Sequence, residues 1–403
     1  ALERSATKYQ AASESRGQAE ALLRAAALLN ETGRGDRALA LYEQVLRVRP
    51  EASEALVGAA RAKAFGGDHA GAAELWAQLV ETSPEVPSKL AEYAVELGKA
   101  RLATGELTEA LASLHWASER GSATTQAQAQ RLLAENAEAR GDVEEAILDL
   151  GTAISPLQEQ LEAAGSNASD ELRTATAELY AERAKLLTRQ TRIDEATHDL
   201  DRVFEIAVPG SALGVEAARA LHELSISRDD LDAQRHWLDV LIATDSGAPE
   251  TARRHFQRAQ LAATDSSAEL DALLLDLDAA LQHTTDDEIR AAALELKARL
   301  LEDADDPRGR AETLTQRVEF AHSPFERAVA ATDAARAWLD ADRADDALKL
   351  AQLAGEELGN AGGVEYSETW LTLGDAAWRK RAWSFVISAS DRLQSLSLIH
   401  ISE

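Results

Sequence analysis

The sequence predicts an all-α fold, a superhelical solenoid of stacked antiparallel helix pairs. Four positions recur after 34 residues (67 − 33), an interval typical of helix-pair repeats. They are Gly33, Ala38, Tyr42 and Pro50, followed by Gly67, Ala72, Trp76 and Pro84. The composition agrees, because 45% of the residues are hydrophobic, largely the helix formers Ala and Leu, and only 4% are aromatic. No alternating apolar pattern of strand length stands out.

The first helix pair is expected between residues 18 and 47. Apolar side chains lie at helical spacing in two blocks, which a polar segment at 31–36 separates. Gly33 lies where the first helix must end, because glycine adopts left-handed backbone with the least strain. Pro50 ends the second helix, since its ring nitrogen has no hydrogen to donate.

The repeated positions resemble those of the tetratricopeptide repeat family, in its bacterial multi-repeat form. That family has small residues where the two helices approach, an aromatic residue in the second helix and a proline after it. The matching residues are Ala26, Ala38, Tyr42 and Pro50, then Ala60, Ala72, Trp76 and Pro84. Small side chains allow helix axes to approach toward the lower end of about 8–10 Å. The resemblance implies that the aromatic residue fills the space between successive pairs, and that the first helices form a concave wall.

The repeated small, aromatic and glycine positions, which we call marks, recur in weaker form and predict eight further helix pairs, ten in all. The marks are Leu97, Gly98, Gly105 and Ala110; Ala134, Gly141 and Ala146; Tyr180, Ala184, Ala196 and Leu200; Ala233 and Trp237; the segment 256–281, with a mark near residue 272; Ala311; Trp338 and Ala347; and Trp370, Leu373 and Gly374. The last three reproduce the W-x-x-L-G opening of the family.

The predicted organisation has five segments. They are a remnant of a preceding helix (1–17), regular repeats (18–155), an insertion or hinge (156–170), divergent repeats (171–390) and a tail (391–403). The insertion accounts for an interval of 50 residues between the marks Ala146 and Ala196 (196 − 146). Its Gly- and Ser-containing end, 165–169, predicts a loop, with Asp170 as the expected N-cap of the next helix.

The start of the chain suggests a piece of a longer protein, and its far end suggests an artefact. The sequence begins with Ala and contains no Met. Residues 398–403 differ from the Ala-, Glu- and Arg-rich body, and are expected to be an artefact of read-through into adapter DNA.

The acidic composition favours some partners over others. A formal net charge of −28 repels nucleic acid and anionic lipid, and no apolar stretch approaches the ~20 residues that span a bilayer. The chain has no Cys, and therefore no disulfide or thiolate metal site. We expect a cytoplasmic protein that binds a protein or peptide, with a periplasmic location left open. The oligomeric state is left undecided.

The sequence predicts neither an active site nor a cofactor or metal. The nine His are scattered, and His222 and Glu223 are followed by Ile226 and Ser227, so the zinc motif H-E-x-x-H is not completed. No nucleophile elbow or phosphate-binding loop occurs. Adjacent acids are expected to cap helices or occupy turns, as at Asp229-Asp230, Asp286-Asp287 and Asp305-Asp306.

The tryptophans are expected mainly in the core. Trp76, Trp237 and Trp338 occupy aromatic positions of their repeats. Trp370 and Trp378 are instead predicted to share a helix face and to form an interface patch.

One set of basic and aromatic residues is predicted to face a partner in the concave groove: Arg61, Phe65, Lys99, Arg131, Lys185 and Arg189. A positive stripe of this kind would hold an acidic peptide or a C-terminal carboxylate. The alternative is that these residues form salt bridges between repeats, because Glu54, Glu92, Glu135 and Glu138 share the wall. Leu23 and Ala27 stand where the family's carboxylate clamp has basic and Asn residues.

Three functions remain open at this stage. The first is a non-catalytic scaffold that binds a protein or peptide partner in its concave groove. The second is a helical regulatory or sensor region of a larger signalling protein or enzyme, with the catalytic domain outside this sequence. A self-assembling array is a third reading.

Overall fold

The computed structural model describes residues 17–30, 32–244, 248–264, 268–359 and 367–401. Within these ranges the regular structure is helical throughout, and no strand occurs. The chain divides into two compact units, Ala1–Leu221 and His222–Glu403. The boundary lies within α11, outside the predicted insertion or hinge at 156–170.

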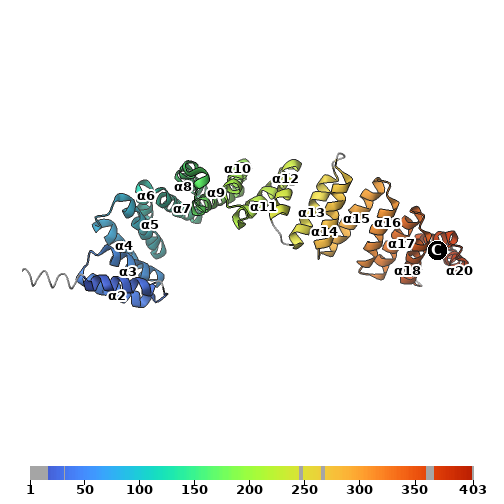
Figure 1. The fold of residues 1–403 in the computed structure, drawn as a ribbon, viewed down its shortest axis with the longest axis horizontal. Helices are drawn as coiled ribbons and strands as arrows, with labels where there is room; N and C mark the ends of the chain where they lie inside the picture. The colour runs from blue at the N-terminus through green and yellow to red at the C-terminus, as the bar shows by residue number, and fades with distance from the viewer. Residues whose placement is uncertain (1–16, 31, 245–247, 265–267, 360–366, 402–403) are drawn as a thin grey trace, which may run out of the picture. The chain divides into compact units, whose positions relative to one another are not determined.

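Unit 1 is a row of helices, and from α2 to α10 each packs on the next (Figure 1). Residues 17–30 are helical. The elements that follow are α2 (Gly35–Val48), α3 (Ser53–Phe65), α4 (His69–Thr82), α5 (Pro87–Thr104), α6 (Leu107–Arg120), α7 (Ala123–Arg140), α8 (Val143–Ala164), the 3₁₀ turn η1 (Gly165–Asn167), α9 (Asp170–Arg189), α10 (Ile193–Ile206) and the first part of α11 (Ala212–Ser227).

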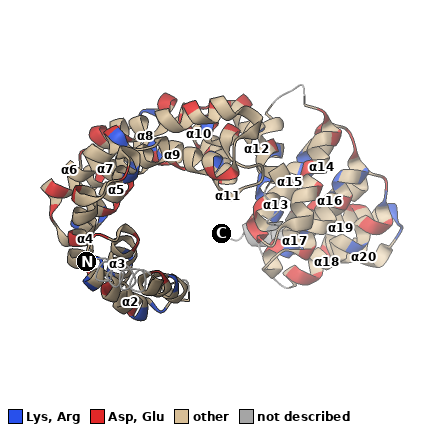
Figure 2. Ribbon diagram, turned by 60° about the vertical axis from the view of Figure 1, so that its left-hand side comes forward, with Lys and Arg blue, Asp and Glu red and all other residues tan. Residues whose placement is uncertain are grey.

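Unit 2 repeats the pattern from the end of α11 onward. Its helices are α12 (Leu231–Thr244), α13 (Ala248–Ala262), α14 (Leu270–His283), α15 (Asp287–Asp303), α16 (Pro307–Glu319), α17 (Pro324–Asp340), α18 (Ala344–Leu358), α19 (Ser367–Arg379) and α20 (Trp383–Ile401). With the helix at 17–30, the described helices make ten consecutive pairs, as the sequence marks predict. Acidic and basic positions are interspersed along the helices of each unit (Figure 2).

The same type of backbone turn joins the two helices in nine of the ten pairs. In the remaining pair, α13 and α14, the turn includes residues outside the described ranges. In each turn one residue has positive φ, and the amide after it donates to the carbonyl five residues earlier, at 2.8–3.0 Å. This is the Schellman closure of a helix C-terminus. Glycine holds the left-handed position in the first four turns, at Gly33, Gly67, Gly105 and Gly141.

In the later turns other residues take the same backbone conformation: Thr191, Asp229, Asp305, Asp342 and Arg381. Asp tolerates it better than most residues, whereas Thr and Arg are strained there. The predicted capping role of the acid pairs is confirmed for their second members in two turns. Asp230 accepts from the Ala233 amide at 3.0 Å, and Asp306 accepts from the Gly309 amide at 2.9 Å.

The core consists of small residues at the helix crossings and larger ones between pairs. Ala26, Ala60 and seven of the predicted alanine marks are fully buried: Ala38, Ala72, Ala110, Ala146, Ala196, Ala311 and Ala347. One mark is wrong: Gln234 is buried in place of Ala233, and its side-chain amide donates to the Ser225 carbonyl at 3.2 Å. The mark expected near residue 272 is Leu273, which is buried.

The aromatic marks fill the space between successive pairs, as expected. Trp76 on α4 stacks on Tyr93 of α5, with ring centroids 5.8 Å apart. Trp237 and Trp338 are also buried.

Much of the interval of 50 residues is helical. α8 runs through Pro156 to Ala164 and is 22 residues long, against 14 for α2, α4, α6 and α10. The loop is confined to a 3₁₀ turn and two further residues. The N-cap of α9 is Ser169, whose hydroxyl accepts from the Leu172 amide at 3.2 Å, and Asp170 is the first helical residue.

At the other end, α20 continues to Ile401, so most of the predicted tail is helical. Residues 1–16 and 402–403 lie outside the described ranges.

Candidate partner-binding groove

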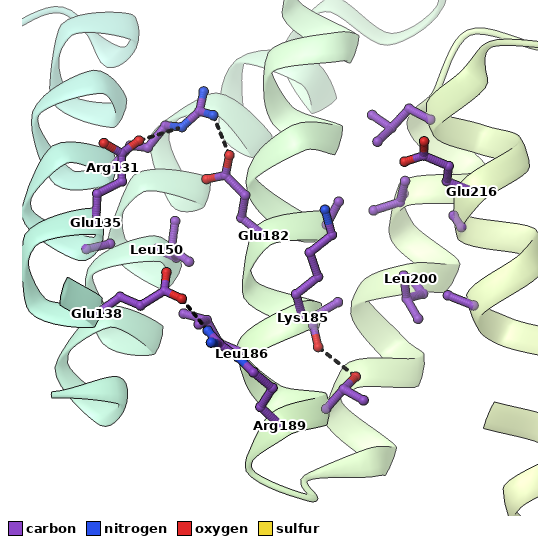
Figure 3. A pocket seen from close by; sticks show the side chains of 18 residues that line it. Arg131, Glu135, Glu138, Leu150, Glu182, Lys185, Leu186, Arg189, Leu200 and Glu216 are labelled. Carbon is purple, nitrogen blue, oxygen red and sulfur yellow. Dashed lines mark hydrogen bonds and ion pairs between the residues drawn. The ribbon is translucent and has the colours of Figure 1, made fainter. Parts of the chain in front are cut away.

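Three helices of unit 1 present matching stripes of side chains to one groove. Residues spaced i, i+3, i+4 and i+7 share a helix face. The stripes are Arg131, Ala134, Glu135 and Glu138 on α7; Ala181, Ala184, Lys185 and Thr188 on α9, with Glu182 and Arg189 beside them; and Leu213, Glu216, Ala217 and Ala220 on α11. Together they line a groove of about 730 Å³ (Figure 3).

The floor of this groove is apolar. Leu150, Leu186, Leu200 and Val203 line it, and each is largely buried. Alanines at the centres of the three stripes leave the floor open, because a longer side chain there would cover it. The groove therefore offers buried methyl groups to a ligand, which is the usual composition of a binding pocket.

Ion pairs tie α7 to α9 along one side of the groove. Arg131 pairs with Glu182 through Nη2, and its Nη1 lies 3.6 Å from Glu178 Oε2. Two turns further along, Arg189 pairs with Glu138 (Figure 3). For these two arginines the structure favours salt bridges between repeats over a free positive stripe.

Across the groove, between α9 and α11, two charged side chains have no such partner. Among the residues that the structure describes, Lys185 and Glu216 make no ion pair or side-chain hydrogen bond, and both are exposed. Figure 3 shows them on α9 and α11 with no interaction between them. The lining as a whole has three basic and four acidic residues, so the expected positive stripe is not present here.

Glu182 is the most perturbed carboxylate of the groove. Burial raises its pKa, and the neighbouring charges of Glu135 and Glu178 add to the rise, while Arg131 opposes it. Its pairing with Arg131 is what keeps a half-buried negative charge at this position.

The other predicted groove residues lie outside this lining. Arg61 and Phe65 lie one turn apart on α3, and Phe65 is 87% exposed. Lys99 on α5 pairs with Glu96 of its own helix at 2.8 Å. The structure therefore brings Arg131, Lys185 and Arg189 to one groove, and leaves Arg61, Phe65 and Lys99 elsewhere on unit 1.

The predicted interface patch is wrong in one of its two residues. Trp370 is only 6% exposed and packs against Gly355, Leu373 and Ala389, whereas Trp378 is 61% exposed. Eight residues along a helix amount to about 80° of rotation beyond two turns, which is enough to move one ring into the core. The exposed partner of Trp378 is Trp383, edge-to-face with ring centroids 5.4 Å apart.

A second groove, in unit 2, was missed by sequence reasoning. It measures about 800 Å³ and lies along α15, α16, α17 and α19. Its lining has six acidic and four basic residues, several of them paired, such as Arg310 with Glu302 at 3.2 Å and Arg336 with Glu368 at 3.3 Å. Asp333 lies in its wall, and burial raises its pKa. The signal for this groove was the charged i, i+3, i+4 spacing on α15, α17 and α19.

Metal-binding groups and membrane-spanning helices are two further features that bear on function. In the described ranges, no group of three or more His, Asp or Glu is arranged to hold a metal ion. Within the same ranges, none of the helices combines the length and the apolar character needed to cross a bilayer.

Comparison with known proteins gives matches among solved structures. No family model matches the sequence, and no curated protein matches it. The C-terminal part of a tetratricopeptide repeat-containing protein from Cytophaga hutchinsonii is 13% identical, over 66% of this chain and 97% of that one, with a TM-score of 0.45.

Two other solved structures are similar in the same way. YrrB, described as a tetratricopeptide repeat protein with an unusual peptide-binding site, is 19% identical over 52% of this chain and 97% of its own, with a TM-score of 0.36. A tetratricopeptide repeat protein from Parabacteroides merdae is 17% identical over 67% and 93%, with a TM-score of 0.35. These proteins are of the family that the sequence marks resemble.

Proposed function

We propose that this chain is a non-catalytic scaffold that binds a protein or peptide partner in the groove lined by α7, α9 and α11. The observation that carries the proposal is the groove of about 730 Å³, with buried Leu and Val side chains as its floor and charged residues along its rim. Binding sites commonly have volumes of about 300–1,000 Å³, apolar floors and a few polar groups that fix orientation.

Several features support a groove that exists before the partner arrives. The floor residues belong to the core between α8, α9 and α10, and the ion pairs of Arg131 and Arg189 hold α7 against α9. A site of this kind loses little conformational entropy on binding, because its walls are already ordered.

The test uses short random peptides displayed on phage and selected against the full chain. Thr188 is exposed on the α9 stripe, so Thr188→Trp places a large ring over the groove without replacing a core residue. We expect selected peptides to bind this variant at least tenfold more weakly than the original chain.

The matched control is Thr104→Trp. Thr104 is also exposed near a helix C-terminus, and its hydroxyl donates to the Arg101 carbonyl at 3.1 Å, as that of Thr188 donates to the Ala184 carbonyl at 2.8 Å. This variant should bind the selected peptides as the original chain does. If the selection yields no peptide whose binding Thr188→Trp weakens, the groove is not the partner site.

A further inference from the structure

The two charged side chains between α9 and α11 define the chemistry of the ligand. Resting on the function proposed for this groove, we infer that it takes a short peptide with an apolar anchor residue, flanked by an acidic residue on the Lys185 side and a basic residue on the Glu216 side. The peptide is thus dipolar, and it differs from the acidic ligand that a row of basic residues would favour.

The arginines of the groove are already engaged. A ligand carboxylate at Arg131 has to displace Glu182, whose carboxylate is half-buried and whose pKa burial has already raised. A ligand carboxylate at Arg189 has to displace Glu138. Leaving the half-buried Glu182 without its partner is unfavourable, so Arg131 is a poor site for a ligand anion. Arg189 and Glu138 are both exposed, so a ligand anion at Arg189 exchanges one weak ion pair for another and gains little.

Lys185 and Glu216 require no such displacement. Both are exposed, and neither has a partner in the described part of the chain. An incoming carboxylate can therefore pair with the Lys185 ammonium, and an incoming ammonium or guanidinium with Glu216. Because the two groups stand on different helices, opposite charges on the ligand fix its direction across the groove.

The apolar floor of the groove is the binding site for the anchor residue of the peptide. Leu150, Leu200 and Val203 lie beneath the opening that the alanines of α9 and α11 leave, and burial of an apolar ligand side chain against them removes that side chain from water. An apolar residue between the two charged ones therefore places all three groups of the ligand against complementary groups of the groove.

The experiment exchanges the two charges. The double variant Lys185→Glu with Glu216→Lys keeps the net charge and reverses the polarity of the groove. A peptide selected on the original chain is labelled with fluorescein, together with a version in which its acidic and basic residues are exchanged and a version with Ser at the anchor. Fluorescence anisotropy then gives the affinity of each.

The original chain should prefer the selected peptide to its charge-exchanged version by about tenfold, and the double variant should show the opposite preference. The Ser version should bind both proteins at least tenfold more weakly. The control exchanges an exposed pair in unit 2, Arg308→Glu with Glu312→Arg, where the charges lie 3.0 Å apart, and it should leave every affinity unchanged.

The outcomes separate the inference from the function on which it rests. If Thr188→Trp abolishes binding but the charge exchange leaves the preference unaltered, the groove is the site and the dipolar ligand is wrong. The same conclusion follows if the selected peptides are uniformly acidic and lose affinity with Arg131→Gln or Arg189→Gln. If no peptide is sensitive to Thr188→Trp, both the inference and the function fail.

Discussion

The ring of Tyr42 occupies the space that a side chain at position 58 would need. A Cβ placed on Gly58 would lie 2.3 Å from Tyr42 Cζ and 2.4 Å from Cε1, although Gly58 is in the middle of α3 and has no need for positive φ. Tyr42 is buried between the first and second helix pairs. Glycine thus gives up helix propensity at this position to let the two pairs approach.

Gly58→Ala should therefore destabilise the protein although it improves the helix propensity of α3. We expect a loss of about 1–3 kcal/mol, because overpacking has to move a buried ring. The measurement is urea denaturation followed by circular dichroism. Gly35→Ala is the matched control: Gly35 lies in the first turn of α2 with no atom within 4 Å of an added Cβ, and its substitution should be neutral or slightly stabilising.

Asp305 provides the opposite case, a position where glycine should be better. Its φ of 57° is in the left-handed region, which glycine adopts without strain. Asp305→Gly should stabilise unit 2 by about 0.5–1 kcal/mol, by the same denaturation measurement. Asp303→Gly, at the helical end of α15, should instead lose about that amount, and equal effects at both positions would contradict the role of backbone conformation.

Asp333 should make the stability of unit 2 depend on pH. Burial raises the pKa of its carboxyl, and the repulsion by Glu368 adds to the rise, against the attraction of Arg317, Arg336 and Arg310. Below the ordinary value of 3.8, the carboxyl is protonated in both the folded and the unfolded chain. As pH rises through the raised pKa, folding increasingly requires the burial of a charge, and stability from this group is lost.

Asp333→Asn should therefore gain stability relative to the original chain as pH rises from about 4 to about 7. Urea denaturation at the two pH values gives the difference directly. Glu312→Gln serves as the control, because Glu312 and Arg308 form an exposed pair, which contributes less than about 1 kcal/mol. An advantage of Asp333→Asn that shrank toward neutral pH would contradict the effect of burial.

The two tryptophans of α19 should respond differently to truncation. Trp370→Ala removes a buried ring that packs against Gly355 and Leu373, and should cost about 3–5 kcal/mol. Trp378→Ala removes an exposed ring that packs edge-to-face on Trp383, and should cost about 1 kcal/mol or less. Similar losses in denaturation midpoint would mean that both rings stabilise the fold.

The repeat architecture was predictable because its strongest marks have local causes. Gly67 ends α3, and Ala72 and Trp76 on α4 meet a neighbouring helix at fixed offsets from that turn. The later turns were harder to locate, since Asp229 and Asp305 take the left-handed conformation that glycine takes earlier. From the sequence alone, an Asp with positive φ cannot be distinguished from the capping Asp that follows it.

The groove was only partly predictable, for a different reason. The helical register predicts Arg131, Lys185 and Arg189 on one wall, and the structure brings these three side chains to one groove. Their partners are 51 residues away in the sequence for Arg131 with Glu182 and for Arg189 with Glu138. Such pairs depend on the offset between successive repeats, and the unusually long α8 makes that offset irregular between α7 and α9.

The shared closure of the helix pairs has a consequence for how such a chain diversifies. In nine of the described turns the helix end is closed by a hydrogen bond between one backbone amide and one carbonyl. The residue with positive φ is glycine, aspartate, threonine or arginine. Recombination at any of these turns would join two helices through the same backbone hydrogen bond, whichever residue has positive φ. Gain or loss of a whole helix pair should therefore disturb the fold less than an insertion or deletion inside a helix. The latter would move the alanines of that helix out of register with its neighbours.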